Sequence, residues 1–512
     1  MSGKKINQLK GGVILSYLSL FLGNGISIIY TPIMLRLLGQ SEYGLYNLVS
    51  SFVAYLGLLS FGFDNTYLRY YTQYKHKESK EKVASLNGMF LAVFTAMGLV
   101  AFIVGSILCR FSNEVFGDKL TASELETAKI LMFLLVINIA ITFPSNVFKI
   151  FINANERFVF AKVVNLIKTV VNPFVTIPLL LMGYKSVALV VVTLIYTVVI
   201  DVLNLWYCFK KLDMKISFKN FEFKLFKNIA GFSLFVFLGE IVDEINWNVD
   251  KFLLGRFKGT VDVAIYGVAA SLSSYFRQFS IYISSVFSPR VNKIVATEND
   301  NTILTELMIK VGRIQFFVLS LVATGFVFFG ESFCVLWAGE DYRSSYMIAV
   351  ALMVPSIIPL IQNLGISVLL ARNKHRFRSV AFFIIALINV LISIPFCKLY
   401  GGLGCAIGTG MSLIVGNGLI INLYYKKLGL NIAAFWKSIF SMTKGSIIPV
   451  AIGVVTMVCG FDYNLITLLC GISVYAIIYV LSMYKFGCND YERNLIFGFI
   501  KKIKGKISHA NI

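Results

Sequence analysis

Several ionisable side chains interrupt a stretch that is otherwise typical of a membrane interior, FLGEIVDEINWNVDKFLLG at residues 237–255. A helix turns by about 100° per residue, so the polar residues of this stretch share one stripe of its surface. A carboxylate at the middle of a bilayer costs about 2.5–3.5 kcal/mol, which predicts that the stripe faces water or a partner rather than lipid. The stripe consists of Glu240, Glu244, Trp247 and Lys251, with Asp243 and Asp250 at its edge.

Two kinds of chemistry fit an acidic stripe at this depth. At a rise of about 1.5 Å per residue, Glu240 lies about 16 Å from the expected inner boundary at Ile229, close to the midplane, whereas Asp250 reaches the outer interface. The stripe could line a polar cavity, or it could form a static ion-pair lock between helical bundles. Both interpretations require oppositely charged or polar partners nearby.

The next apolar stretch, SLSSYFRQFSIYISSVFSP, supplies a candidate counter-charge. We expect Arg277 at about the depth of Glu240, on a helix face that it shares with Ser273, Ser280 and Ser284. The planar guanidinium suits phosphate and carboxylate groups. Arg277 is therefore predicted to bind an anionic head group, to pair with the acids of the preceding helix, or to alternate between them.

Three further charged residues lie at the ends of the first two apolar stretches. The second ends in FGFDNTYLRYY, where Asp64 and Arg69 straddle the inner interface, and Arg36 lies at the outer end of the first. Arginines near helix ends commonly extend to the interface, which is the alternative to a binding role here.

The elements that must position these residues are membrane helices. The chain has 512 residues, of which 57% are hydrophobic and 14% charged, and its mean hydropathy is +0.77. A soluble domain has roughly 45–50% apolar and 25% charged residues. The composition predicts an all-α polytopic membrane protein with no soluble domain between its spans.

Apolar runs long enough to cross a bilayer predict about fourteen helices. Lysines and arginines concentrate in alternate loops, which places both termini in the cytosol, with the segments 149–168 and 290–313 counted among the inner ones. The net charge of +21 is thus explained by basic inner loops that face anionic lipid, and no nucleic-acid partner is needed to explain it. The predicted spans are 12–36, 43–66, 84–109, 128–148, 163–183, 186–208, 229–254, 263–287, 312–333, 344–370, 379–398, 401–423, 446–460 and 464–484.

Two places in the chain resemble each other: LLGQSEYGLYNLVSS from Leu37 and LLGRFKGTVDVAIYGVAASLSS from Leu253. The similarity arises either by chance among apolar residues or from duplication of a six-helix unit. Lysine-rich amphipathic segments after the sixth and twelfth spans favour duplication. The predicted organisation is an N-terminal bundle (1–210), a cytosolic amphipathic linker (211–228), a C-terminal bundle (229–424), a second amphipathic segment (425–445), two further helices (446–486) and a basic cytosolic tail (487–512).

The sequence lacks the features that most enzyme classes need. It has no phosphate-binding G-x-x-x-x-G-K-[ST] loop, and its eight scattered cysteines predict neither a disulfide framework nor a metal site. The loops are too short to build a catalytic site outside the helices. We expect no enzyme activity and no cofactor, and the sequence does not decide whether a proton or sodium gradient is used.

The segment YTPIMLRLLGQSEYGLYNLVSSFVAYLGLLSFGFDNTYLRYY resembles the opening of the polysaccharide-biosynthesis membrane proteins, the oligosaccharide and O-antigen flippases. A second segment, NVDKFLLGRFKGTVDVAIYGVAASL, resembles their second-half signature. The matching positions are Leu38-Gly39, Gly44-Leu45-Tyr46, Gly62 and Arg69-Tyr70 in the first segment, and Asp250, Leu254-Gly255, Tyr266 and Ala269 in the second.

This resemblance implies membership of the multidrug/oligosaccharidyl-lipid/polysaccharide exporter superfamily, with two six-helix bundles in a V around a central cavity and transport by alternating access. It implies flipping of a polyprenyl-pyrophosphate-linked oligosaccharide across the bacterial plasma membrane, with membrane lipids, a polysaccharide polymerase and glycosyltransferases as partners. Arg277 and Arg69 would then meet the pyrophosphate. The alternatives are a cation-coupled multidrug antiporter, a lipid II or teichoic-acid precursor flippase, and a scaffold protein without transport.

Overall fold

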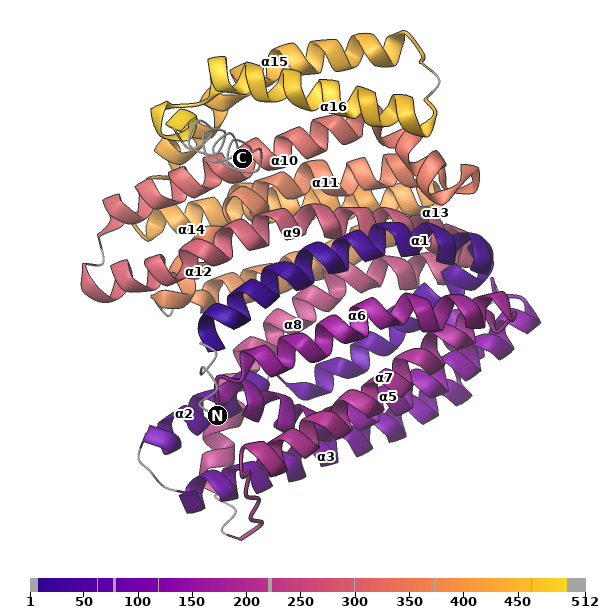
Figure 1. Ribbon diagram of the computed structural model, residues 1–512, viewed down its shortest axis with the longest axis vertical. Coiled ribbons are helices and arrows are strands. Elements are labelled where there is room, and N and C mark those ends of the chain that lie inside the picture. Colours follow the sequence, from indigo (N-terminus) through magenta and orange to yellow (C-terminus); the bar gives the residue numbers. More distant parts are fainter. Residues whose placement is uncertain are drawn as a thin grey trace, which may run out of the picture. The chain divides into compact units, whose positions relative to one another are not determined.

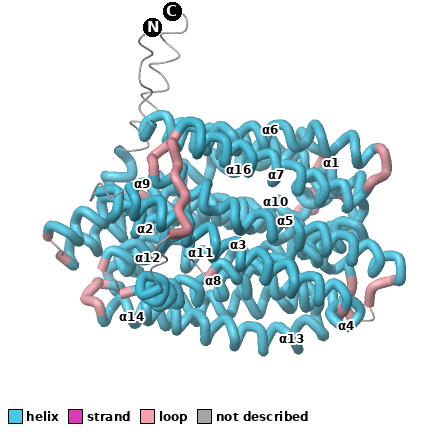
Figure 2. The backbone as a smooth tube through the Cα atoms, turned by 90° about the horizontal axis from the view of Figure 1, so that it is seen from below, coloured by secondary structure: helices cyan, strands magenta, loops and turns pink. Residues whose placement is uncertain are grey.

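The computed structural model describes residues 8–61, 63–76, 80–117, 119–219, 223–298, 300–372, 374–461 and 463–494. Within these residues the protein consists of helices and the loops that join them, with no strand (Figure 2). The all-α prediction is therefore confirmed. Long apolar segments favour helices because a helix satisfies every interior backbone hydrogen bond within itself, which a bilayer demands.

Most helices are longer than the apolar runs that predicted them, often by several residues, although the helix over residues 465–482 is shorter than its predicted span 464–484. Those of the first half are α1 (Gln8–Ala54), the 3₁₀ turn η1 (Tyr55–Ser60), α2 (Phe63–His76), α3 (Lys80–Arg110), α4 (Ser112–Phe116), α5 (Ala122–Ala154), α6 (Phe158–Leu181), α7 (Lys185–Lys211) and α8 (Phe223–Phe257). Those of the second half are α9 (Thr260–Thr297), α10 (Asn301–Ala338), the turn η2 (Glu340–Tyr342), α11 (Ser345–Ile361), α12 (Asn363–Ala371), α13 (His375–Leu413), the π segment η3 (Ile414–Ile420), α14 (Ile421–Lys427), α15 (Ile432–Val458), α16 (Leu465–Ser482) and the π segment η4 (Met483–Gly487).

Two of these helices contain a sharp kink at a glycine. In α1 the backbone of Gly39 has φ 74° and ψ 171°, and in α13 that of Gly401 has φ 58° and ψ −136°. Such positive φ angles are readily adopted only by glycine. The two kinks fall where the sequence predicts a turn between consecutive spans, 12–36 and 43–66 in the first case and 379–398 and 401–423 in the second.

Eight helices of the described segments are long and apolar enough to cross a membrane, or nine if the bent pair α11 and α12 forms one span. The chain is an integral membrane protein. The predicted total of fourteen spans stays a prediction.

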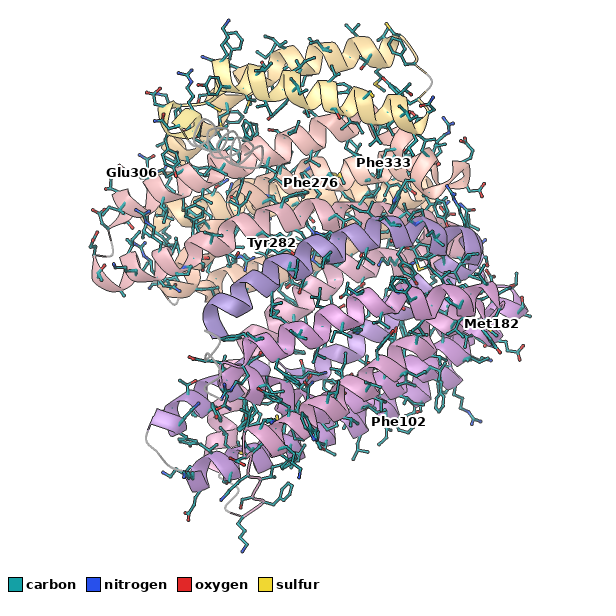
Figure 3. The ribbon with its side chains drawn as sticks, in the orientation of Figure 1. Phe102, Met182, Phe276, Tyr282, Glu306 and Phe333 are labelled. Atoms are coloured by element: carbon teal, nitrogen blue, oxygen red, sulfur yellow. The ribbon has the colours of Figure 1, made fainter. Side chains whose placement is uncertain are left out.

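The chain forms two compact units. Unit 1 contains residues 1–267 and 390–402, and unit 2 contains residues 268–389 and 403–512. In unit 1, α3 packs on α5 and α5 on α7, while α1 packs on α6 and α8 (Figure 1). Large apolar side chains cover its outside, such as Phe102 on α3 and Met182 beside the end of α6 (Figure 3). Surfaces of this kind suit contact with lipid tails.

An aromatic cluster fills one end of unit 1. Tyr67, Phe90 and Phe94 are fully buried there. The Tyr67 hydroxyl donates a 2.5 Å hydrogen bond to Asn87 Oδ1, and Asn87 Nδ2 donates to the Lys215 carbonyl. The segment 212–219 therefore lies against α3 without being helical. Residues 220–222 of the predicted amphipathic linker lie outside the described residues, and from Phe223 the linker belongs to α8.

The two similar segments lie against each other in unit 1. A Cβ atom on Gly44 would come within 1.8 Å of the Thr260 carbonyl oxygen and 3.2 Å of the Ala264 nitrogen. Gly267 faces the side chain of Asn47 in the same way. The backbones of α1 and α9 thus approach more closely than any residue larger than glycine allows at position 44.

In unit 2, α10 packs on α11, α15 and α16, and α15 and α16 lie side by side (Figure 1). The segment 425–445 was predicted to be a separate amphipathic element. In the structure its first residues end α14 at Lys427, and its residues from Ile432 onward begin α15, which runs to Val458. Phe276 on α9 is buried within unit 2, and its ring lies among the helices (Figure 3).

A buried ion pair connects the chain near its C-terminus to the middle of unit 2. Arg313 on α10 and Glu492 are 4% and 6% exposed, and Arg313 Nη2 donates to Glu492 Oε2 at 2.8 Å. Further acceptors for the guanidinium are the carbonyls of Ser438 and Gly487 and the Ser441 hydroxyl. With its Nε bound to Glu492 Oε1, every N–H donor of this arginine has an acceptor.

Candidate functional site

The acidic stripe predicted from the sequence lies on α8, which packs within unit 1 against α1, α2 and η1. Glu240 is half-buried, and its Oε2 accepts a 3.3 Å hydrogen bond from the Ser60 hydroxyl. Glu244 is half-buried and accepts from Asn248 one turn later, whereas Asp243 is exposed. Asp243 is thus the most exposed of these three acids, and Glu240 and Glu244 are partly covered by neighbouring side chains.

Trp247 and Lys251, on the same stripe, are both half-buried. Asp250 differs, because it is 1% exposed and its Oδ2 accepts a 2.6 Å hydrogen bond from the Tyr266 hydroxyl. Both members of this pair belong to the second signature segment. The bond ties α8 to the start of α9 across the turn between them, which gives the signature a physical meaning that its spacing did not reveal.

Arg277 lies on the part of α9 that belongs to unit 2, and its side chain is half-buried. The acids of α8 belong to unit 1, so their pairing with Arg277 stays a prediction.

The serines that share the face of Arg277 are buried inside unit 2. Gln315 Nε2 on α10 donates to the hydroxyls of Ser280 and Ser284, and the Ser280 hydroxyl donates to the Leu360 carbonyl. Gln315, itself fully buried, was missed from the sequence, although a lone glutamine in an apolar run was the available signal. The face is polar because it packs on α10 and α11, as its poor match to lipid suggested.

The remaining predicted residues lie near helix ends. Arg36 is exposed and precedes the kink at Gly39. Asp64 and Arg69 belong to α2, and their side chains lie outside the described part of the structure. Their predicted roles stay predictions.

The structure also brings together three charged residues that the sequence analysis did not select. Asp201 on α7 is 7% exposed. Lys149 Nζ on α5 lies 3.1 Å from Asp201 Oδ1, and Lys168 on α6 interacts electrostatically with both. We call these residues the α5–α7 charge cluster. The sequence analysis counted segment 149–168 among the inner ones, and that placement stays a prediction. In the structure α5 continues to Ala154, so Lys149 lies on this helix.

Metal chemistry finds no support in the described residues, where no group of three histidine, cysteine or acidic side chains could hold an ion. All eight cysteines are free thiols. The arrangement offers a set of polar and charged side chains on membrane helices, a chemistry that suits contact with a polar molecule.

Comparison with known proteins agrees with this arrangement. The family model described as "Polysaccharide biosynthesis protein" matches residues 9–295, more than half of the chain. The chain belongs to the polysaccharide biosynthesis protein family. This confirms the resemblance inferred from the two signature segments, both of which fall inside the matched range.

One curated relative of the chain is described as "Putative O-antigen transporter" of Shigella flexneri. The two chains are 23% identical over 407 residues, which cover 77% of this chain and 92% of the relative.

Solved structures share the fold. The lipid II flippase MurJ in an inward closed conformation superposes with a TM-score of 0.71 at 17% identity, covering 95% of this chain and 99% of the other. An inward-facing multidrug resistance MATE family transporter of the MOP superfamily gives 0.65 at 14% identity, covering 80% and 96%. At these identities the comparison establishes the fold alone.

Proposed function

We propose that this protein flips a polyprenyl-pyrophosphate-linked oligosaccharide from the inner to the outer leaflet of the bacterial plasma membrane, for surface polysaccharide synthesis. The observation that carries the proposal is the family match over residues 9–295, joined by the O-antigen transporter relative that aligns over 77% of the chain. Both termini would lie in the cytosol, as the distribution of lysine and arginine predicts.

The charges on the membrane helices support this function. A glycan head group with a pyrophosphate cannot cross hydrocarbon unaided, since each charge there costs several kcal/mol. The acids of α8 and Arg277 would provide polar partners during alternating access, with the lipid tail remaining in the bilayer. Arg277 and Arg69 would contact the pyrophosphate, whereas Glu240 and Glu244 would line the path of the sugars.

The decisive experiment deletes the gene in a strain whose glycosyltransferases are intact and which lacks a second flippase. We expect lipid-linked repeat units to accumulate on the cytosolic side and surface polysaccharide to fall. Complementation with the wild-type gene should reverse both changes. Normal surface glycan with no accumulation would reject the proposal.

Two alternative functions can be distinguished from the proposed one by experiments in the same strain. The match to a lipid II flippase keeps a peptidoglycan precursor as a candidate substrate, and in that case deletion would block cell-wall synthesis rather than surface glycan. The match to a multidrug transporter keeps a cation-coupled antiporter as a candidate. Overexpression would then raise resistance to cationic compounds, with α8 acids as the proton or sodium site.

A further inference from the structure

The α5–α7 charge cluster joins three helices of unit 1, and its Lys149 lies five residues before the end of α5. The C-terminal end of α5, the N-terminal end of α6 and the C-terminal end of α7 share one side, because consecutive helices alternate in direction. Lys168 follows the start of α6 by ten residues, and Asp201 precedes the end of α7 by ten, so each is about 15 Å from that side. Both therefore lie near the centre of their helices.

The cluster carries an excess of positive charge. Asp201 is the only acidic residue in α6 and α7 together, and it is shared by two lysines. Helix α1 packs against both α6 and α7. Its only acidic residue, within residues 8–54, is Glu42. Glu42 is engaged near the other end of α7, by Lys185 at 3.4 Å and by the Ser186 hydroxyl at 2.5 Å. With both lysines protonated, the cluster has a net charge of +1.

The hydrogen bonds of the cluster are incomplete. Lys149 Nζ approaches Asp201 Oδ1, but no described residue donates a hydrogen bond to either carboxylate oxygen, although both are buried. The Lys168 ammonium forms neither a hydrogen bond nor an ion pair of 4 Å or less with any described residue. Buried polar groups are normally satisfied, and an ammonium deep in a membrane protein marks a pathway or binding site by default.

We propose that Lys168 and Lys149 form an anion-binding site between α5, α6 and α7 of unit 1. The site takes the acidic group of the translocated head group, either its pyrophosphate or an acidic sugar, and Asp201 holds Lys149 while the site is empty. This inference rests on the proposed function for the identity of the ligand. Lysine binds phosphate as a point charge, and the side chain of Lys149 is 35% exposed and hence accessible.

An anion site and a cation site predict opposite effects at Asp201. If the cluster binds an anion, Asp201→Asn removes a repulsive charge, and affinity stays equal or rises. If it binds a proton or sodium ion, the carboxylate is the ligand, and the same substitution abolishes binding. Substitution of Lys168 has the opposite effects on affinity, because removing the ammonium weakens an anion site and strengthens a cation site.

The test uses the full-length protein in nanodiscs of phosphatidylcholine. Undecaprenyl pyrophosphate is the first probe, undecaprenol is its uncharged control, and inorganic pyrophosphate and glucuronate are soluble probes that separate phosphate from sugar carboxylate. We expect Lys168→Gln to weaken binding of the preferred anion about tenfold, the value of one charge-assisted hydrogen bond. Lys168→Arg should retain most of the affinity, and Lys129→Gln near the opposite end of α5 should leave it unchanged.

Wild-type affinity in Lys168→Gln, loss of binding in Asp201→Asn, or no binding of any anionic probe would each overturn the proposal. If Lys168→Gln does not fold, Asp201→Asn and Lys168→Arg still decide the question. The outcome is separable from that of the proposed function. A deletion strain that accumulates lipid-linked repeat units but is fully complemented by Lys168→Gln would reject this site alone.

Discussion

Two regions bury charged groups in opposite ways. In unit 2, every donor of the Arg313 guanidinium has an acceptor, and Glu492 closes the network from near the C-terminus. In unit 1, the α5–α7 charge cluster leaves both oxygens of Asp201 without a hydrogen bond from the described residues. A saturated network has nothing left to offer a solute, whereas an unsaturated one does.

This contrast separates charges that hold the fold from charges that are available for transport. Both kinds look alike in the sequence, as single ionisable residues in apolar runs. The difference lies in hydrogen bonding, and it predicts a ranking of the effects of substitution on stability.

The largest effect is expected for Glu492→Ala. The substitution leaves the Arg313 guanidinium buried and without its carboxylate, which typically costs about 3–5 kcal/mol. Chemical unfolding of the purified protein in detergent measures the loss. A double variant with Arg313→Met and Glu492→Leu should lose less than the single variant, because it buries no unpaired charge. A loss below about 1 kcal/mol for Glu492→Ala would remove the distinction between the two regions.

An intermediate effect is expected for Tyr266→Phe. Asp250 is buried, and loss of the tyrosine hydroxyl removes a hydrogen bond to a charged group, typically about 1.5–3 kcal/mol. The matched control is Tyr282→Phe, whose hydroxyl donates to Gln278 in a less buried position of unit 2. Equal losses in the two variants would show that burial of the Asp250 bond adds nothing.

A smaller effect is expected for Asp201→Asn. The carboxylate makes no hydrogen bond with a described residue, and its partner Lys149 is accessible enough to be solvated once the charge is gone. We expect the free energy of unfolding to change by about 1 kcal/mol, the centre of the range for single substitutions. A loss of 3 kcal/mol or more would place the cluster in the same class as the pair of Arg313 and Glu492.

The smallest effect is expected for Glu340→Gln at the exposed turn between α10 and α11. Hydrogen bonds from Arg343 hold the pKa of Glu340 below its ordinary value. Because the pKa is lower in the folded than in the unfolded protein, the stabilisation is complete above the ordinary pKa of glutamate and disappears as the pH falls through the folded one. Melting temperatures of wild type and variant should differ slightly at pH 7 and converge at acidic pH. A gap that widens on acidification would contradict this assignment.

The sequence predicted the fold class and the acidic stripe because both arise from local periodicity. Repeated apolar runs require helices, and the spacing from Glu240 to Glu244 places both residues on one helix face wherever that helix lies. The boundaries between the predicted spans 12–36 and 43–66 and between 379–398 and 401–423 were also found locally, and the kinks at Gly39 and Gly401 fall there.

The contacts between distant helices could not be predicted. Asp201, Lys149 and Lys168 lie on three helices, and Arg313 and Glu492 are separated by 179 positions along the chain. Single charges in apolar runs carry no periodic signal, so only tertiary packing reveals which of them meet. The burial of Asp250 against Tyr266 was hidden because residues 16 apart approach each other only through the turn between α8 and α9.

The close approach of α1 and α9 has a consequence for the origin of the chain. If Tyr46 is aligned with Tyr266, Gly44 is equivalent to Ala264 and Asn47 to Gly267, and these are the pairs that face each other. Equivalent residues meet in this way only across a two-fold axis, as in an isologous dimer. If the two segments arose by duplication, a half-length ancestor with one copy of the segment would have had a self-complementary surface. Fusion of two tandem copies of its gene would then have preserved an interface that already existed between separate subunits.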